Sequence, residues 1–389
     1  MSEERARAQS ILEYLAGQCD AMVEMLVSLV EKESPTDVVA SQAAVQSQLS
    51  DALCELGFGV RHVPGRETGG HLFAVPEHRE RGKPAQLLIG HSDTVWPLGT
   101  LETMPVVVEN GHVRGPGTFD MKAGIVQGIF ALRALRELGH QPPATPVWFI
   151  NSDEETGSPE SKRYVRLIAK HVARAFVLEP ALGLVGHLKT ARKGVGRFVV
   201  RVHGKAAHSG LDPTGGASAI HELMHVVQRL HAITDLERGV TVNVGVVRGG
   251  SRVNVIAAEA EAEVDVRILS ASDGEAIAET IHAMRALTPG TSLEIEGGIQ
   301  IPPLERTARN RLLWQAAAEA GGRLGMDLTE DISGGGSDGN TTSLYTATLD
   351  GLGPRGDGAH ANHEHVEIES LVDRAALVAE LLMSPVESG

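Results

Sequence analysis

The sequence lacks most features that mark secreted and membrane-spanning proteins. Its 389 residues include only two cysteines, Cys19 and Cys54, which excludes a disulfide framework and a zinc site built on thiolates. No apolar run approaches the roughly 18 residues of a membrane-spanning helix. The first residues, MSEERARAQSILEYLAG, contain no apolar core of signal-peptide length. We therefore expect a cytoplasmic protein with no membrane partner.

Positive charge is also scarce. The chain has 35 Lys and Arg residues against 50 Asp and Glu residues, which gives a formal net charge of -15. An acidic surface repels nucleic acids and anionic membranes, so neither is expected as a partner. The share of apolar residues, 42%, is ordinary for a globular protein, and the length allows two domains.

Short apolar strands alternate with amphipathic helices in residues 1–185. Helical spacing at Val45, Leu49 and Leu53 stops at Gly57, and a second helix is predicted at 120–139. Buried strands are predicted at 58–63, 72–75, 86–90, 145–152 and 173–180. This alternation is typical of an α/β domain with a mostly parallel sheet covered by helices. In such domains ligands bind beyond the carboxyl ends of the strands.

A different pattern occupies residues 186–301. Strands and helices are predicted in the order β-α-β-β-α-β, which is that of a ferredoxin-like domain. In its first helix we expect four apolar residues to face inward: Ile220, Leu223, Val227 and Leu230. Residues 302–389 return to the first pattern. The sequence therefore predicts an outer domain, 1–185 and 302–389, interrupted by an inserted domain, 186–301.

Imidazole and carboxylate side chains recur where the predicted elements of the outer domain begin or end. They are His91, Asp93, Asp120, Glu154, Glu155, Glu179 and His360. Each alone has an ordinary interpretation, such as a loop residue, a solvated acidic turn or a helix N-cap. Together they form a ligand set that zinc accepts. Crowded carboxylates repel one another without a cation, and paired cations suit hydrolysis.

Five stretches of this region, GHSDTV, GPGTFDMKAG, DEETGS, LEP and GAHANHE, resemble in their order the signatures of a dizinc peptidase family. That family contains acetylornithine deacetylase, succinyl-diaminopimelate desuccinylase and glutamate carboxypeptidase. The resemblance covers nearly the whole chain and is nearest to the bacterial glutamate carboxypeptidases. It implies a carboxypeptidase-like hydrolase that cleaves an amide bond in a small peptide or N-acyl amino acid. An N-acyl amino acid deacylase of the same family is the alternative.

The resemblance implies two Zn²⁺ ions per subunit, and Co²⁺ or Mn²⁺ would suit the same ligands. Asp120 would bridge the two metals. His91 and Glu179 would complete the protein ligands of one metal, and Glu155 and His360 those of the other. The outer domain would then be the catalytic domain.

Two neighbours of these ligands also receive roles from the resemblance. Asp93 would fix the ring orientation and tautomer of His91. Glu154 would act as the general base on a metal-bridging water, which the cations acidify. The Asp120–Met121 peptide bond is expected to be cis.

The inserted domain carries the stretch GKAAHSG, which resembles the lid motif of the family. The resemblance implies that His208 reaches the active site of the other subunit as an oxyanion donor, and hence a homodimer through the inserted domain. Asn254 and Arg267 match substrate-binding residues of the glutamate carboxypeptidases. A satisfied turn histidine and a salt-bridge arginine are the competing interpretations of His208 and Arg267.

One position departs from the glutamate carboxypeptidases. Where they carry an arginine that grips the substrate carboxylate, this chain has Ile301. A missing guanidinium loses bidentate recognition of a carboxylate. We therefore expect a leaving group that is less acidic, or one that is held differently, for example through Arg267 or Lys193.

The stretch SGGGSDGN permits two interpretations. In the family, Gly335 and Gly336 would line the substrate cleft with accessible backbone N–H groups. Ser337 also fits the G-x-S-x-G elbow of serine hydrolases, which is the alternative from a different class. The elbow requires a buried strand before the serine, and DLTEDIS is a poor one. A non-catalytic relative is a third hypothesis, but the presence of Glu154 and all five apparent ligands favours an enzyme.

Overall fold

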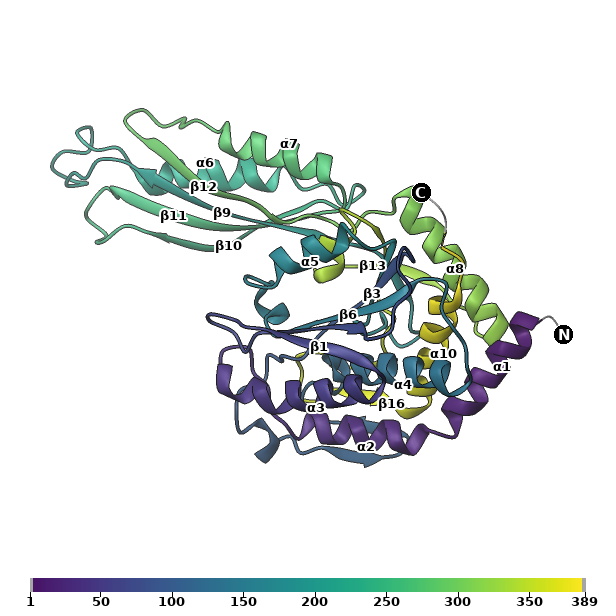
Figure 1. The fold of residues 1–389 in the computed structure, drawn as a ribbon. Coiled ribbons are helices and arrows are strands. Elements are labelled where there is room, and N and C mark those ends of the chain that lie inside the picture. Colours follow the sequence, from purple (N-terminus) through teal and green to yellow (C-terminus); the bar gives the residue numbers. More distant parts are fainter. Residues whose placement is uncertain (1–2, 387–389) are drawn as a thin grey trace. The chain divides into compact units, whose positions relative to one another are not determined.

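A computed structural model describes residues 3–386, which form two compact units (Figure 1). Unit 1 comprises the described residues up to Thr190, Arg306–Ile332 and those from Ser337 onward, and unit 2 comprises Ala191–Glu305 and Ser333–Gly336. These limits lie a few residues from those expected. Residues 333–336 were expected in the outer domain. They group with unit 2, where Lys193 N–H donates to the Ser333 carbonyl and Arg192 donates to the carbonyls of Gly335 and Gly336.

Unit 1 is built on a six-stranded sheet with the order β1-β2-β6-β3-β7-β14. The pairs β6–β3, β3–β7 and β7–β14 are parallel, whereas β1–β2 and β2–β6 are antiparallel. The predicted α/β class with a mostly parallel sheet is therefore confirmed. The strands are β1 (Phe58–Val63), β2 (His71–Pro76), β3 (Ala85–His91), β6 (Thr145–Asn151), β7 (Arg174–Val177) and β14 (Ala347–Leu349).

The two faces of this sheet belong to different hydrophobic cores, because successive strand side chains point to opposite faces. Leu88 and Trp148 join the large core under the longer helices, whereas Leu87 and Val147 join a small core that includes Val165. The helices of unit 1 are α1 (Glu3–Ala16), α2 (Cys19–Val30), α3 (Gln42–Glu55), α4 (Ala123–Glu137), α5 (Lys162–Ala169), α8 (Ala308–Leu324), α9 (Asp338–Thr342) and α10 (Ile368–Met383).

The remaining elements outside the ferredoxin-like domain are short. A second sheet has the order β15-β16-β5-β4, with β4 (Val107–Glu109), β5 (His112–Arg114), β15 (Gly356–Asp357) and β16 (His365–Glu367). A pair is formed by β8 (Leu188–Arg192) and β13 (Glu330–Ser333). Single turns are η1 (Val39–Ser41), η2 (Thr100–Glu102), η3 (Thr118–Lys122) and η4 (Glu154–Thr156). No helix within residues 3–386 has the length and apolarity needed to cross a membrane.

Unit 2 has the predicted β-α-β-β-α-β order. Its elements are β9 (Gly194–His203), α6 (Ala219–His231), β10 (Thr241–Gly249), β11 (Glu259–Ile268), α7 (Ala271–His282) and β12 (Ser292–Ile301). The antiparallel sheet has the order β10-β11-β9-β12, which is the ferredoxin-like arrangement. Alternate residues of β11 are buried, as its strict apolar–polar alternation predicts.

The predicted burial of one residue of unit 2 is wrong. Leu223 and Leu230 of α6 are fully buried, but Ile220 is 41% exposed. Its side chain lies against Gly249 and Gly250, which have no side chains to cover it. Ile220 therefore belongs to the surface of unit 2.

Candidate metal centre

Three neighbouring parallel strands of unit 1 direct polar side chains to one edge of the sheet. His91 is the last residue of β3, Glu154 and Glu155 begin η4 shortly after β6, and Glu179 follows β7 by two residues. The carboxyl ends of parallel strands meet at the same edge, so residues far apart in sequence converge there.

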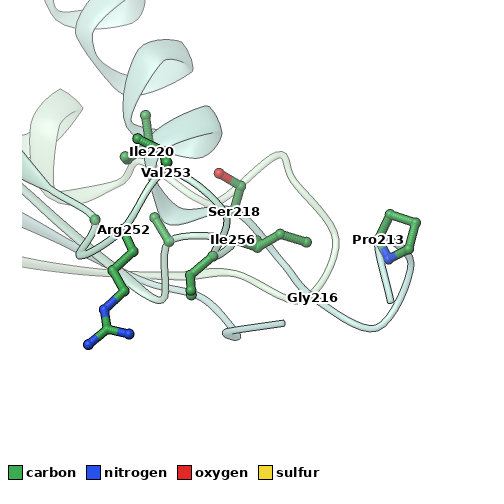
Figure 2. A pocket seen from close by; sticks show the side chains of 10 residues that line it. Pro213, Gly216, Ser218, Ile220, Arg252, Val253 and Ile256 are labelled. Carbon is green, nitrogen blue, oxygen red and sulfur yellow. The ribbon is translucent and has the colours of Figure 1, made fainter. Parts of the chain in front are cut away.

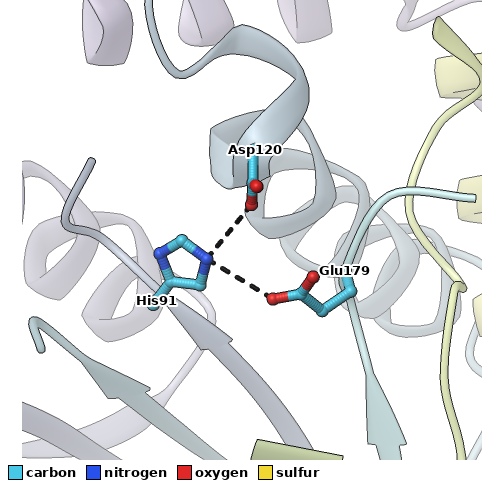
Figure 3. A group of neighbouring side chains, drawn as sticks. All are labelled: His91, Asp120 and Glu179. Atoms are coloured by element: carbon cyan, nitrogen blue, oxygen red, sulfur yellow. Dashed lines mark ion pairs between the residues drawn. The ribbon is translucent and has the colours of Figure 1, made fainter. Parts of the chain in front are cut away.

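Asp120 and His360 complete two three-residue groups at this edge. In the first, His91 Nε2 lies 3.3 Å from Asp120 Oδ1 and 3.4 Å from Glu179 Oε1 (Figure 3). In the second, His360 Nε2 lies 3.3 Å from Asp120 Oδ2 and 3.1 Å from Glu155 Oε2. Asp120 thus offers one carboxylate oxygen to each group. The ligand atoms of each group lie within 4.8 Å of one another.

The donor atoms of both groups fit divalent cations. Among the described residues, the buried atoms His91 Nε2, Asp120 Oδ1 and Glu155 Oε1 make no hydrogen bond. Buried polar atoms are normally satisfied, so unpaired donor atoms in both groups are typical of a metal site. One imidazole nitrogen and two carboxylates in each group form a set that zinc and similar cations accept.

The two imidazoles of the site lie among several carboxylates. Burial disfavours the charged imidazole of His91, but the partners Asp120, Asp93 and Glu179 outweigh it and raise the pKa of His91 well above its ordinary value. Hydrogen bonds to Asp120 and Glu155 raise the pKa of His360 to about 10. A proton and a cation therefore compete for the same nitrogen lone pairs.

Asp93 supports His91 in a way that differs in detail from expectation. The closest partner of His91 Nδ1 is the backbone carbonyl of Asp93, at 3.0 Å, and the carboxylate lies at 3.4 Å. Both contacts favour a proton on Nδ1, which leaves Nε2 as the ligand atom.

The carboxylate of Asp93, fully buried, has a second task. It accepts backbone N–H groups from Glu154, at 3.4 Å, and Glu155, at 3.2 Å, and the hydroxyl of Thr36 at 2.7 Å. One side chain thus links His91 to the turn that carries the expected base and another expected ligand.

Glu154 stands beside the two groups without a partner of its own. Within residues 3–386 its carboxylate makes no hydrogen bond or ion pair. Burial, followed by the negative charge of Glu179, raises the pKa of Glu154 well above its ordinary value. A carboxyl group with an elevated pKa can both take up and return a proton near neutral pH.

The backbone around two of the ligands is unusual. His360 has a φ of 61°, in the left-handed region that residues other than glycine seldom adopt. Such conformations cluster at functional sites. The Asp120–Met121 peptide bond is cis, as expected.

Comparison with known proteins identifies the family. Residues 87–384 match the peptidase family M20/M25/M40. The chain belongs to this family. The resemblance seen in the sequence is thereby confirmed, and the protein is a hydrolase of the metallopeptidase and amidohydrolase class.

Two curated relatives span most of the chain. Carboxypeptidase G2 of Pseudomonas sp. strain RS-16 is 30% identical over 378 residues, which cover 93% of this chain and 89% of that protein. Succinyl-diaminopimelate desuccinylase of Thioalkalivibrio sulfidiphilus is 26% identical, with coverage of 90% and 94%. The crystal structure of aminopeptidase PepT from Bacillus cereus has the same fold, with a TM-score of 0.78 at 22% identity and coverage of 94% and 98%.

Glu364 is a residue of this M20-family site that sequence reasoning missed. Its buried carboxylate accepts the N–H groups of Gly117 at 3.0 Å, Phe119 at 2.9 Å and Asp120 at 3.0 Å, and the Trp96 indole N–H at 2.7 Å. Burial raises the pKa of Glu364 to about 7 although the hydrogen bonds oppose it. Glu364 thus fixes the loop that presents Asp120. The available signal was an acidic residue four positions after His360.

Asp338 was also missed. It accepts hydrogen bonds from Asn151 Nδ2 at 2.6 Å and from the Ser158 hydroxyl at 2.7 Å. Burial raises the pKa of Asp338 to about 6. These bonds fasten both ends of the segment that carries Glu154 and Glu155.

Ser337 is not arranged as a nucleophile. It is the N-cap of α9, where its hydroxyl accepts the Gly339 N–H at 3.0 Å and donates to Asp350 at 2.6 Å. Within the described part of the chain no imidazole forms a hydrogen bond with it. The structure therefore speaks against the serine-hydrolase alternative, because an activated serine requires an adjacent base.

The expected substrate-binding residues lie in unit 2. His208 and Asn254 are both exposed on adjacent segments, joined by the bond from Ser209 N–H to the Asn254 carbonyl at 3.0 Å. Arg267 forms a bidentate pair with Asp265 of the same strand, at 2.8 and 3.1 Å. The carbonyls of Gly335 and Gly336 accept bonds from Arg192 at 3.2 and 3.1 Å.

A shallow apolar cavity of 390 Å³ adjoins these segments in unit 2. Figure 2 shows Ile220 and Val253 close together and the Arg252 guanidinium directed away from them. Val253 is fully exposed. Exposed apolar side chains around a hollow are typical of a surface that another molecule covers.

Proposed function

We propose that this M20-family protein hydrolyses an amide bond of a small peptide or N-acyl amino acid at a dinuclear metal centre. One observation carries the proposal: Asp120 shares its two oxygens between two ligand groups, and the carboxylate of Glu154 lies near them with no hydrogen bond or ion pair to any described residue. A bridged metal pair next to an unengaged base is suited to hydrolysis.

Each residue of the cluster receives a role under this proposal. His91, Asp120 and Glu179 would hold one Zn²⁺, and Asp120, Glu155 and His360 the other. The bound metals would acidify water and polarise the scissile carbonyl. Glu154 takes the proton from the attacking water and delivers it to the leaving amine. Asp93 keeps His91 in the ligand tautomer and holds the backbone of Glu154 in place.

We further propose that His208 donates a hydrogen bond to the reacting oxyanion in the other subunit. The N–H groups of Gly210 and Leu211 both donate to His208 Nδ1 at 3.1 Å. The proton of the neutral ring is then on Nε2, which makes that atom a donor. A donor of this kind stabilises a developing negative charge.

A homodimer through unit 2 would bring this histidine to the partner. Exposed apolar residues are available for it on α6, near the end of β10 and in the loop that follows: Ile220, Met224, Val247 and Val253. Contiguous exposed apolar residues favour a protein–protein contact.

The substrate is expected to differ from a peptide with a C-terminal glutamate. Ile301 offers no charge, and the guanidinium of Arg267 is engaged by Asp265. A carboxylate-selective site needs a guanidinium free for bidentate binding. These contacts favour a leaving amino acid without an acidic side chain.

The test is hydrolysis of a panel of N-acyl amino acids and dipeptides by the metal-loaded protein, with the released amine identified by mass spectrometry. We expect turnover that disappears on chelation and returns with Zn²⁺. Release of the C-terminal residue of peptides indicates a carboxypeptidase, and preference for acyl groups such as acetyl indicates a deacylase. Turnover that survives chelation would contradict the metal mechanism, and best turnover on folate-type N-acyl-glutamates would contradict the expected substrate.

A further inference from the structure

A groove that hydrolysis does not use lies on the second face of the unit 1 sheet. It has a volume of 450 Å³ and is lined by residues of β1, β2 and β6, the first residue of β3, and α5. Its walls are mainly apolar and include Phe73, Val75, Val147, Phe149 and Ile168. This volume is within the range of small-molecule sites, which are commonly apolar with a few polar groups.

The groove exists because α5 is too short to cover this face. The helix has eight residues and buries Val165 and Ala169. Phe73 and Val75 of β2 lie only partly buried at the margin of the small core. Gly59, opposite Val75 on β1, has no side chain and prolongs the hollow by an adjoining 330 Å³.

The rim of the groove is positively charged in an otherwise acidic protein. Arg61 and Arg79 line both hollows, and Arg81 and Lys83 line a third beside them together with Glu80. Within residues 3–386 none of these four cations forms an ion pair. In a chain with a net charge of -15, such a cluster provides a local attraction for an anion.

The groove and the metal centre share no residue. It touches β3 at Ala85, whereas the ligand His91 is at the other end of the same strand. The groove extends along β6 to Phe149, which pairs with Ile89, two residues before His91.

We propose that this groove binds an amphipathic carboxylate, a molecule with one apolar chain and an anionic head. The hydrocarbon part of the ligand lies on Phe73, Val75, Val147 and the α5 side chains, and its binding removes apolar surface from water. The carboxylate pairs with Arg61 and Arg79, whose guanidinium groups suit a carboxylate. This site stands whether or not the proposed hydrolytic function holds.

Calorimetric titration of the metal-loaded full chain with decanoate tests the site. We expect one saturable site per chain, weaker binding of decanol and no binding of decyltrimethylammonium. Exchange of both rim arginines, Arg61→Glu with Arg79→Glu, should weaken decanoate binding about tenfold or more, because two charge-assisted bonds are lost. The matched control is Arg166→Glu, an exposed arginine on α5 that does not line the groove. It should bind decanoate as the parent does.

A second variant separates the apolar contact from the charge. Leu167 lines the groove and is 58% exposed, so Leu167→Asp should fold and should weaken both decanoate and decanol. Equal decanoate binding by the double arginine variant and the parent would overturn the proposal. So would non-saturable uptake at many sites. A change of oligomeric state in the double variant, followed by sedimentation, would identify the groove as a contact between copies and would equally overturn it.

Discussion

The metal-ligand cluster of unit 1 and the His208 segment of unit 2 are both polar, yet they are built in opposite ways. In unit 1 three of the five ligand residues follow the ends of parallel strands, and the buried carboxylates of Asp93 and Glu364 support the site through several hydrogen bonds each. In unit 2 His208 and Asn254 are exposed and are held by bonds from neighbouring backbone groups. The cluster is therefore held in place by hydrogen bonds from within unit 1. Under the proposed function, the His208 segment acts on the site of a second subunit.

The largest effect should come from removing the base. In Glu154→Gln the side chain keeps its size but cannot take up the proton, so we expect kcat to fall about 1,000-fold. Bound zinc, measured by atomic absorption, should stay at the parent level because Glu154 belongs to neither ligand group. Glu102→Gln, which changes an exposed carboxylate in unit 1, is the matched control. Parent-like kcat in Glu154→Gln would mean that another group is the base.

Removal of His208 from the unit 2 segment should lower kcat less than removal of the base does. His208→Ala removes one oxyanion donor, which should lower kcat by about 100-fold with the metal content unchanged. If the donor acts across subunits, mixing His208→Ala chains with Glu154→Gln chains restores activity, because one site of the mixed dimer has both groups. No recovery after mixing would show that His208 does not act on a partner.

A substitution in the surface around Ile220 tests independently whether unit 2 forms the dimer contact. Ile220→Glu places a charge on an exposed apolar position, so it should yield monomers that fold, bind metal and share the kcat loss of His208→Ala. Sedimentation velocity reads the oligomeric state. Leu236→Glu, at a residue of unit 2 that is 76% exposed and lies outside this surface, is the control. A dimer that persists in Ile220→Glu would place the contact elsewhere.

The residues that converge at the sheet edge of unit 1 could be proposed from the sequence because the patterns that mark them are local. Apolar strands and the polar residues that follow them can be read in short windows, and parallel strand ends must converge. Glu364 escaped because its partners lie 244 to 268 residues away, and no short window contains them. Ile220 was misplaced because helical spacing does not reveal that Gly249 and Gly250 leave its side chain uncovered. Ser337 matched an elbow motif but acts as an N-cap, since its surroundings decide its role.

Within the cluster, substitution of the ligand His91 and of its supporting residue Asp93 should have different effects on metal content and activity. His91→Ala should lose metal from one of the two positions. Asp93→Asn should keep more metal yet lower activity by about 10- to 100-fold, because the tautomer of His91 and the backbone of Glu154 and Glu155 lose their anchor. Metal stoichiometry and kcat measured on the same samples distinguish the two. Normal values for both variants would show that this pair has no part in the site.

The smallest effect is expected from Glu364, and its substitution tests how firmly hydrogen bonds hold the unit 1 cluster. In Glu364→Gln one oxygen is replaced by an NH₂ group, which faces donor N–H groups and cannot accept from them. The loop that presents Asp120 loses part of its anchorage, so zinc affinity, measured by competition with a chelator, should fall about tenfold. The Co²⁺-substituted enzyme should show an altered visible spectrum, which a purely structural role away from the metals would not produce. Parent-like affinity and spectrum would show that the backbone alone fixes Asp120, and that Glu364 contributes only to folding.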